Sequence, residues 1–183
     1  MKKVFFGGSR QLGRLNKAVR ERADNIISNG YLVLVGDADG ADKAMQSYLA
    51  EKLYQHVQVF CTGGECRNNL GHWETIHVQA DRRQRDFQYY ILKDKKMSEE
   101  ADYGFMLWDG KSKGTLNNII NLIEQKKSVL VYFSREKEFF TLKSDRDIMN
   151  LLALCDQMVV KKFEKALKLQ KRIHSPQSHL NIV

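Results

Sequence analysis

Short runs of apolar residues alternate with longer amphipathic segments along most of the chain. Segments 4–6, 31–35, 57–61, 103–108 and 128–133 are almost continuously apolar, which is typical of buried strands in a parallel sheet. Apolar residues recur at helical spacing in segments 15–27, 80–96 and 115–125, and in the segment after Asp39. The alternation predicts an α/β fold: a Rossmann-like, three-layer parallel sheet of about five strands with helices on both faces.

The remaining segments are less regular. Residues 62–78 show no clear period and contain three glycines, so we expect a long loop there. Residues 138–142 are a candidate extra strand at the sheet edge. Ser144 followed by Asp147 predicts the capped start of a helix. A last, basic helix is predicted over residues 157–173.

These elements predict a Rossmann-like nucleotide-binding domain over residues 1–133 and a C-terminal strand and helical extension over residues 134–183, packed on it. Apolar residues make up 43% of the 183 residues and charged residues 28%, an ordinary balance for a globular protein. The net charge is +8, and residues 156–183 carry half of it, with six cations against two acids. This charge suits an anionic ligand or nucleic acid.

The number of cysteines and the N-terminal sequence indicate the cellular compartment in which the protein is expected. Three cysteines are an odd set, which argues against a disulfide framework. The apolar run near the N-terminus is too short for a secretory signal, and no segment has the apolar length of a membrane span. We therefore expect a cytoplasmic protein without a membrane partner.

Three predicted strand-to-helix turns could contact a ligand. The first contains Gly7, Gly8, Ser9 and Arg10. Glycines let backbone N–H groups approach an anion, Ser9 offers a hydroxyl, and Arg10 can neutralise a phosphate. The alternative is an ordinary tight turn.

The second turn runs from Gly36 to Asp42 and holds three carboxylates. Like charges repel a phosphate, so these carboxylates fit a ribose hydroxyl, a base edge or a cation better. Asp37 is the better ligand candidate, and Asp39 is expected to cap the following helix. Gly36 allows the helix to pack closely on the strand and, like Arg85 on the later helix, is counted among the candidate ligand contacts.

The third turn follows the strand 103–108 and opens directly onto a helix. A flexible segment with lysines and hydroxyls at a helix N-terminus can hold a phosphate, because free N–H groups and the positive helix end converge there. A solvated turn is the alternative. The candidate ligand residues in this turn are Asp109, Gly110, Ser112, Lys113, Gly114 and Thr115.

The order of these motifs resembles that of the SLOG superfamily, which includes the LOG phosphoribohydrolases, the "possible lysine decarboxylase" homologues and the Smf/DprA DNA-processing proteins. The residues that carry the resemblance are Arg85-Asp86, Met97, Ala101-Asp102 and Gly114-Thr115, together with the first two turns. The resemblance covers about the first three-quarters of the chain. It implies a Rossmann-like fold with a site for a nucleoside monophosphate, and it favours a homodimer.

The resemblance also bears on catalysis. Arg85 matches the catalytic arginine of the phosphoribohydrolases, but Asn118 stands where their catalytic glutamate would be. An amide cannot act as a base in cleaving an N-glycosidic bond. Asp109 is a candidate substitute, although the similar aspartate of nucleoside deoxyribosyltransferases binds the ligand.

The sequence thus favours binding of a nucleotide or nucleoside phosphate, as in a nucleotide sensor. An enzyme acting on the N-glycosidic bond of a nucleoside monophosphate is the first alternative, and nucleic-acid binding is the second. No cofactor other than a nucleotide ligand is expected. The base and the number of phosphates stay open.

Cysteine and histidine residues in the 62–78 region allow a zinc-site interpretation, at positions Cys61, Cys66, His72 and His77. Their spacing matches no standard zinc finger, and cysteine is often a small core residue, so we expect no metal. In the same region, Arg67, Asn68 and Asn69 could contact phosphate or base. Arg82 and Arg83 are expected on a solvated face, and Trp73, Tyr90 and Trp108 either stack on a base or belong to the core.

Overall fold

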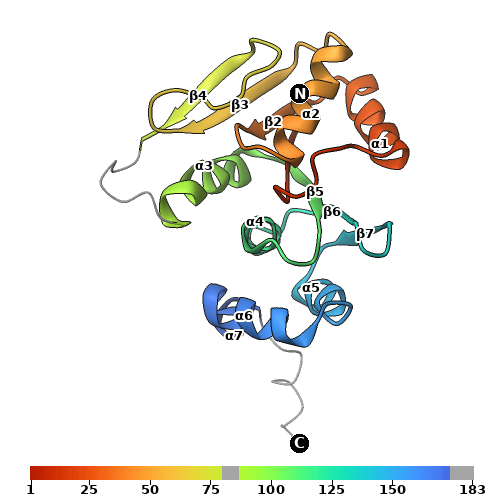
Figure 1. Ribbon diagram of the computed structural model, residues 1–183, viewed down its shortest axis with the longest axis vertical. Helices are drawn as coiled ribbons and strands as arrows, with labels where there is room; N and C mark the ends of the chain where they lie inside the picture. Colours follow the sequence, from red (N-terminus) through yellow and green to blue (C-terminus); the bar gives the residue numbers. More distant parts are fainter. Residues whose placement is uncertain (80–86, 174–183) are drawn as a thin grey trace, which may run out of the picture.

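The computed structural model describes residues 1–79 and 87–173, and within them it contains one sheet of seven strands (Figure 1). The strand order is β4-β3-β2-β1-β5-β6-β7. All neighbouring strands are parallel except β6 and β7. The strands are β1 (Lys3–Gly8), β2 (Leu32–Gly36), β3 (Val57–Thr62), β4 (Glu74–Val78), β5 (Tyr103–Trp108), β6 (Val129–Phe133) and β7 (Glu138–Leu142).

Helices cover both faces of the sheet. Val4 and Phe6 of β1 belong to the hydrophobic cluster beneath α1 (Lys17–Ser28) and α2 (Ala41–Glu51), whereas Phe5 belongs to the cluster beneath α3 (Phe87–Glu100) and α4 (Lys113–Glu124). This alternation follows from the period of two along a strand. The predicted α/β, Rossmann-like fold is confirmed. Among helices in the described residues, none combines the length and apolar character needed to span a bilayer.

The sheet has two strands more than predicted, one at each edge. The candidate strand 138–142 is β7 and pairs antiparallel with β6. The prediction of a loop throughout 62–78 is wrong, because β4 pairs with β3 within that region. β4 reads Glu-Thr-Ile-His-Val and is only partly buried, so it lacks the apolar run by which the central strands are recognised.

One of the two predicted helix caps is confirmed. Ser144 accepts a hydrogen bond from the Asp147 amide while the Asp147 side chain returns to the Ser144 backbone, which forms a capping box. The prediction for Asp39 is wrong, because the N-cap of α2 is Gly40, with a φ of 81°. A Cβ at Gly40 would collide with the backbone of Arg10, so the turn needs glycine for both conformation and space.

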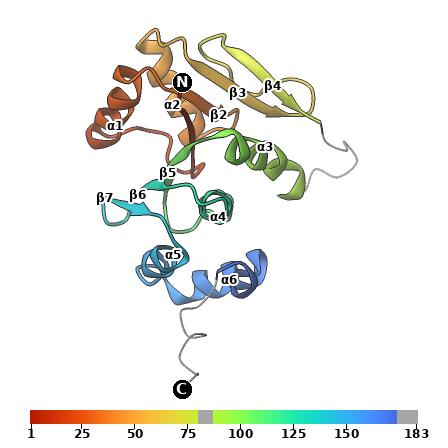
Figure 2. The ribbon, with the colours of Figure 1, turned by 180° about the vertical axis from the view of Figure 1, so that it is seen from behind.

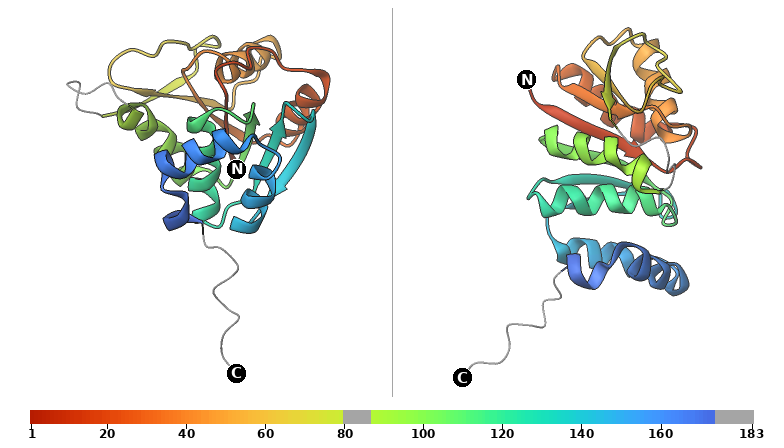
Figure 3. Two further views of the ribbon diagram at one scale, coloured as in Figure 1. Left: turned by 60° about the horizontal axis from the view of Figure 1, so that its bottom comes forward. Right: turned by 90° about the vertical axis from the view of Figure 1, so that its left-hand side faces the viewer.

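The C-terminal extension lies beyond α4, at the end of the molecule away from β4 (Figures 1 and 2). It consists of α5 (Asp145–Leu152), α6 (Gln157–Leu167) and α7 (Leu169–Arg172). The single helix predicted over 157–173 is wrong, since Lys168 adopts a left-handed conformation that ends α6. The stacking of this layer on α4 is clearest in the right-hand view of Figure 3.

Ring packing, hydrogen bonds and a shared hydrophobic cluster connect the extension to the sheet domain. The ring of Phe163 in α6 lies 6.1 Å from that of Trp108 at the end of β5. The Arg172 guanidinium donates hydrogen bonds to the side chains of Asn117, Asn121 and Glu124 on α4. Residues of the extension and of the sheet therefore share one hydrophobic cluster.

The order in which successive strands are added to the sheet changes direction between the parallel neighbours β1 and β5. After β1 the chain crosses through α1 to β2 on one side, and after β5 it crosses through α4 to β6 on the other. The carboxyl ends of adjacent strands whose connections diverge leave a crevice between them, which is where α/β proteins bind ligands.

A substitution at Gly8, the last residue of β1, measures how closely β1 packs against β5 and α2 at the crevice. Gly8→Ala should lower the free energy of unfolding by about 1–3 kcal/mol, because its Cβ would lie 2.6 Å from the Leu107 carbonyl oxygen and 2.7 Å from the Ala41 Cβ. Urea denaturation measures the change. Gly13→Ala is the matched control, since a Cβ there meets nothing within 4 Å. Equal stability of the two variants would contradict close packing of β1 against β5 and α2.

Candidate functional site

A cleft of about 660 Å³ opens at the crevice between the ends of β1 and β5. Residues from both strand ends and from α2, α3 and α4 line it. Of the thirteen residues predicted to contact a ligand, eight line this cleft: Gly7, Gly8, Arg10, Asp109, Ser112, Lys113, Gly114 and Thr115. Residues 80–86 are outside the described residues, so the predictions for Arg82, Arg83 and Arg85 are not tested.

The first turn of α4 forms one wall of the cleft. Ser112 is the N-cap, and its hydroxyl oxygen accepts hydrogen bonds from the Thr115 amide at 3.3 Å and the Thr115 hydroxyl at 2.9 Å. The Trp108 indole N–H donates to the Ser112 carbonyl at 3.0 Å. Gly114 lies in this turn, where a Cβ would meet no atom within 4 Å. The wall therefore combines a helix N-terminus with open space in front of it.

Asp109 holds the turn that precedes α4. Its Oδ1 accepts hydrogen bonds from the amides of Lys111 at 2.9 Å and Ser112 at 2.8 Å, and from the Ser9 hydroxyl at 2.9 Å. The Ser9 oxygen in turn accepts from the Asp109 amide. Ser9 is completely buried, does not line the cleft and positions Asp109, and its role as a ligand contact stays a prediction. Gly110 is likewise absent from the lining of the cleft.

Asp37 lies behind the cleft and binds Arg67. Its carboxylate accepts three hydrogen bonds from Arg67: from Nη2 at 2.7 Å, Nε at 3.0 Å and the backbone amide at 3.1 Å. Burial works to raise the pKa of Asp37, but the bonds from Arg67 outweigh it and the pKa is lowered. The Asp37 carboxylate holds Arg67, which lines the cleft, whereas Asp37 itself does not; its role as a ligand contact stays a prediction.

Lys93 of α3 is buried beside the cleft among carboxylates. Its Nζ lies 2.8 Å from Asp94 Oδ1 and 4.0 Å from Asp37 Oδ1. Burial lowers the pKa of Lys93, but the nearby charges of Asp94, Asp42 and Asp37 raise it more. A Cβ at Gly36 would collide with Lys93 Nζ and with Asp42 Oδ2. Gly36 therefore makes room for this cluster and does not itself line the cleft.

Asp42 and Asn118 complete the floor of the cleft. Burial raises the pKa of Asp42 to about 7, although the charge of Lys93 opposes the shift. Asn118 donates a hydrogen bond from Nδ2 to Asp94 Oδ2 at 3.1 Å. Its Oδ1 is buried and has no hydrogen-bond partner among the described residues. A buried acceptor without a donor costs free energy unless a ligand or water supplies one.

Sequence reasoning missed Lys93 and Asp94 as site residues, and it ranked Asp37 above Asp42 among the carboxylates of the second turn. A signal for Lys93 was present, because it occupies the same helical stripe as Tyr89 and Met97, both of which are buried. A lysine in an apolar stripe is buried only when it is paired. Trp73 and Trp108 are core residues, and the side chain of Tyr90 is outside the described part.

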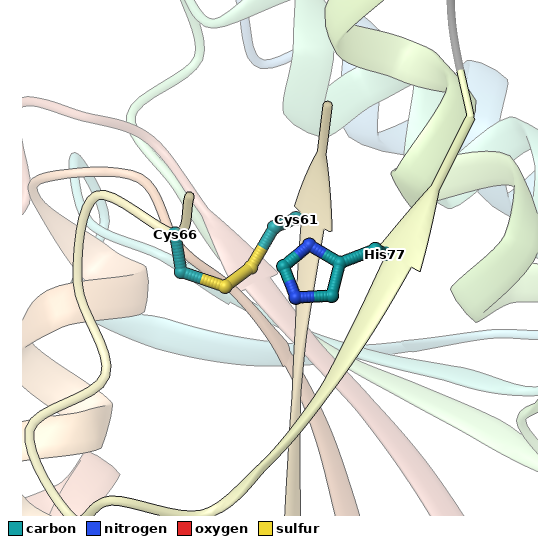
Figure 4. Close-up of side chains that lie close together, drawn as sticks. All are labelled: Cys61, Cys66 and His77. Carbon is teal, nitrogen blue, oxygen red and sulfur yellow. A yellow bond between two sulfur atoms is a disulfide. The ribbon is translucent and has the colours of Figure 1, made fainter. Parts of the chain in front are cut away.

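The structure pairs Cys61 and Cys66 in a disulfide, with a Cα–Cα distance of 5.3 Å. The odd number of cysteines argued against a disulfide framework, but one disulfide forms and Cys155 is left free. The His77 ring lies beside the two sulfur atoms (Figure 4), with ligand atoms of all three residues within 4.8 Å of one another. His72 is not in this group, so the four-residue zinc set suggested by the sequence is not assembled.

Comparison with known proteins bears on the fold. No family model matches the chain, and no curated protein matches it. A solved structure of DNA processing protein A from Helicobacter pylori, described for its single-stranded DNA binding mode, is similar with a TM-score of 0.59 and 15% identity. The similarity covers 91% of this chain and 80% of that one. It supports a DprA-like fold, in line with the Smf/DprA part of the predicted resemblance, and does not distinguish the SLOG or LOG members.

Asp42 gives the site a testable pH dependence. Its folded-state pKa of about 7 exceeds the ordinary 3.8, so between these values only the folded state keeps the proton. The corresponding stabilisation is complete below pH 3.8 and is lost as the pH rises through 7. Between pH 4.5 and 7.5, the unfolding free energy of the wild type should therefore fall relative to that of Asp42→Asn, by on the order of 2 kcal/mol.

Urea denaturation at stepped pH measures this difference. Asp39→Asn is the matched control, because Asp39 is in the same turn and its side chain is 74% exposed. Parallel curves for the wild type and Asp42→Asn would refute the elevated pKa.

Proposed function

We propose that the cleft binds a nucleotide or nucleoside phosphate, with its phosphate at the N-terminus of α4. Five cationic side chains line the cleft: Arg10, Arg67, Lys93, Lys111 and Lys113, of which Lys93 is held among carboxylates. Together with the amides of the first helical turn they favour an anion at this wall. The volume of about 660 Å³ is within the range of small-ligand sites.

The observation that carries the proposal is the unpartnered Oδ1 of buried Asn118, which lines the same cleft as the helix N-terminus. An orphaned acceptor calls for a hydrogen-bond donor on the ligand. The neighbouring carboxylates of Asp42 and Asp94 are acceptors as well. A ligand with a phosphate at one end and hydroxyl or amino groups at the other matches both the wall and the floor, and a nucleotide has this composition.

Binding without hydrolysis fits the residues better than N-glycosidic cleavage. Asn118 has no carboxylate with which to activate water. Asp109 Oδ1 is already occupied by three donors, which suits a structural role in the turn. Cleavage of the N-glycosidic bond of a nucleoside monophosphate stays the alternative activity, with Asp109 and Arg85 as the candidate catalytic residues.

Single-stranded nucleic acid is a second candidate ligand. The solved structure with a similar fold is described as binding single-stranded DNA. In this chain, α6 and α7 present a lysine-rich surface around a shallow cavity of about 340 Å³, formed in part by Lys161, Lys165, Lys168 and Lys171. Clustered lysines attract a phosphate backbone without regard to sequence.

A charge placed at the α4 N-terminus tests the nucleotide proposal. Gly114→Asp should weaken binding of AMP at least about tenfold, because it puts a carboxylate where the phosphate is proposed to lie. The substitution has room, since a Cβ at Gly114 meets nothing within 4 Å. Isothermal titration calorimetry measures the affinity.

Gly13→Asp is the matched control, with the same change of charge and an equally open position away from the cleft. It should leave AMP affinity unchanged. AMP binding that survives in Gly114→Asp, or no binding of any nucleoside phosphate to the wild type, would refute the proposal. Release of ribose 5-phosphate from AMP, lost in Asp109→Asn, would establish the enzymatic alternative instead.

Salt titration tests the nucleic-acid candidate. Affinity for a labelled oligothymidylate should fall as salt rises, by about 0.7 in the logarithmic slope for each phosphate contact. Fluorescence anisotropy should show weaker binding by Lys161→Glu/Lys165→Glu than by Lys2→Glu/Lys17→Glu, which changes the charge equally but away from the lysine-rich surface. Equal affinities of the two double variants would argue against binding at this surface.

A further inference from the structure

A disulfide lies at the start of the segment that delivers Arg67 to the cleft. Cys61 is completely buried at the end of β3, and Cys66 is half-buried in the loop that follows. Figure 4 shows the exposed His77 ring of the neighbouring strand β4 alongside the sulfur atoms. Two bonded sulfurs beside an imidazole have the composition of a thiol–disulfide exchange site.

The loop beyond the disulfide is held by polar contacts to the cleft wall. Arg67 follows Cys66 directly and makes its three hydrogen bonds to Asp37. Asn68 donates to the Asp37 carbonyl at 2.9 Å, and its own carbonyl accepts from Gln46 at 3.2 Å. Gln46 also accepts from the Leu70 amide at 3.0 Å. The loop is thus fixed to β3 by the disulfide at one end and by this polar network beyond it.

We propose that Cys61 and Cys66 form a redox-active pair whose disulfide fixes Arg67 in the cleft and whose reduction loosens it. The reacting partner is a dithiol, either a small molecule or a dithiol protein. The redox chemistry is independent of the nucleotide proposal, and only its effect on ligand affinity rests on that proposal.

The exchange balances with a dithiol as the two-electron donor. A thiolate of the dithiol attacks Cys66 Sγ, the more accessible sulfur, which breaks the Cys61–Cys66 bond and forms a mixed disulfide. Cys61 leaves as a thiolate and takes a proton from water, beside the His77 ring, whose ligand atom is within 4.8 Å of both sulfurs and whose nitrogens contact the Gly63 carbonyl and the Thr75 hydroxyl. The second thiol of the dithiol then attacks the mixed disulfide, releasing Cys66 as a thiol and the reductant as its own disulfide.

Two features make the pair suited to reversible exchange. The sequence separation is five residues, and a short loop constrains the unfolded chain less than a long one, so the fold depends little on the bond. The core also contains many buried apolar side chains on both faces of the sheet that do not involve the bond. The segment that responds is the polar loop between β3 and β4.

The full chain carrying Cys155→Ser tests the proposal without interference from the third thiol. Equilibration in buffers of reduced and oxidised dithiothreitol, followed by maleimide trapping and mass spectrometry, should show both thiols appearing together. Hydrogen–deuterium exchange of residues 63–73 should be at least about fivefold faster in the reduced form, while that of β1 and β5 stays the same. AMP affinity should fall several-fold on reduction.

Variants of Cys66 and His77 separate the effect of the disulfide from that of the neighbouring imidazole. Cys66→Ser should show the fast exchange of residues 63–73 in both buffers, and if it fails to fold, the two redox forms of the Cys155→Ser protein still answer the question. His77→Ala should slow reduction about threefold or more, whereas His56→Ala, at the opposite end of β3, should not.

Identical exchange in the two redox forms would overturn the proposal. So would uptake of one zinc ion by the reduced protein that restores the slow exchange, because the cluster would then be a metal site. Absence of AMP binding in both forms would refute the nucleotide proposal alone, since thiol trapping and exchange do not depend on a ligand.

Discussion

The ammonium of Lys93 is buried where α3 passes the end of the sheet, among carboxylates supplied by the end of β2, by α2 and by α3 itself. Burying a charge costs several kcal/mol unless partners compensate it, so these groups can be assembled only in a tightly determined arrangement. Lys93 and Arg67 offset Asp37 and Asp94, and the raised pKa of Asp42 keeps a third full negative charge from accumulating. This balance fixes α2 and α3 relative to β2, and with them the floor of the cleft. The absence of a side chain at Gly36 is the condition for that approach.

Local patterns were enough to predict the central sheet and the helix N-terminus at the cleft. The bounds of β5 follow directly from its apolar run, and the Ser112–Thr115 wall follows from hydroxyl and glycine residues placed at a helix start. Patterns of this kind depend on neighbours in the sequence, which is why they could be read from it. β4 was missed for the same reason, because an edge strand with one partner needs few apolar residues.

The side chains that form the floor of the cleft could not be predicted, because their positions depend on residues distant in the sequence. Three aspartates fall within residues 37–42, and nothing local decides which of them faces a ligand. Arg67, thirty residues later, donates hydrogen bonds to the Asp37 carboxylate. The positive φ of Gly40 sets the start of α2, and Asp42 in its first turn is buried. The similarity to a DNA-processing protein extends to the fold, whereas the chemistry of the cleft depends on these individual side chains.

The indole of Trp108 links the start of α4, at the cleft, to the C-terminal helices. Its N–H donates a hydrogen bond to the Ser112 carbonyl at the start of α4, and its ring packs near that of Phe163 in α6. Shortening the chain after β6 would therefore remove the cover of a fully buried tryptophan as well as an edge strand. We therefore expect the first turn of α4 and the C-terminal helices to be coupled in stability, because both pack on the same buried indole.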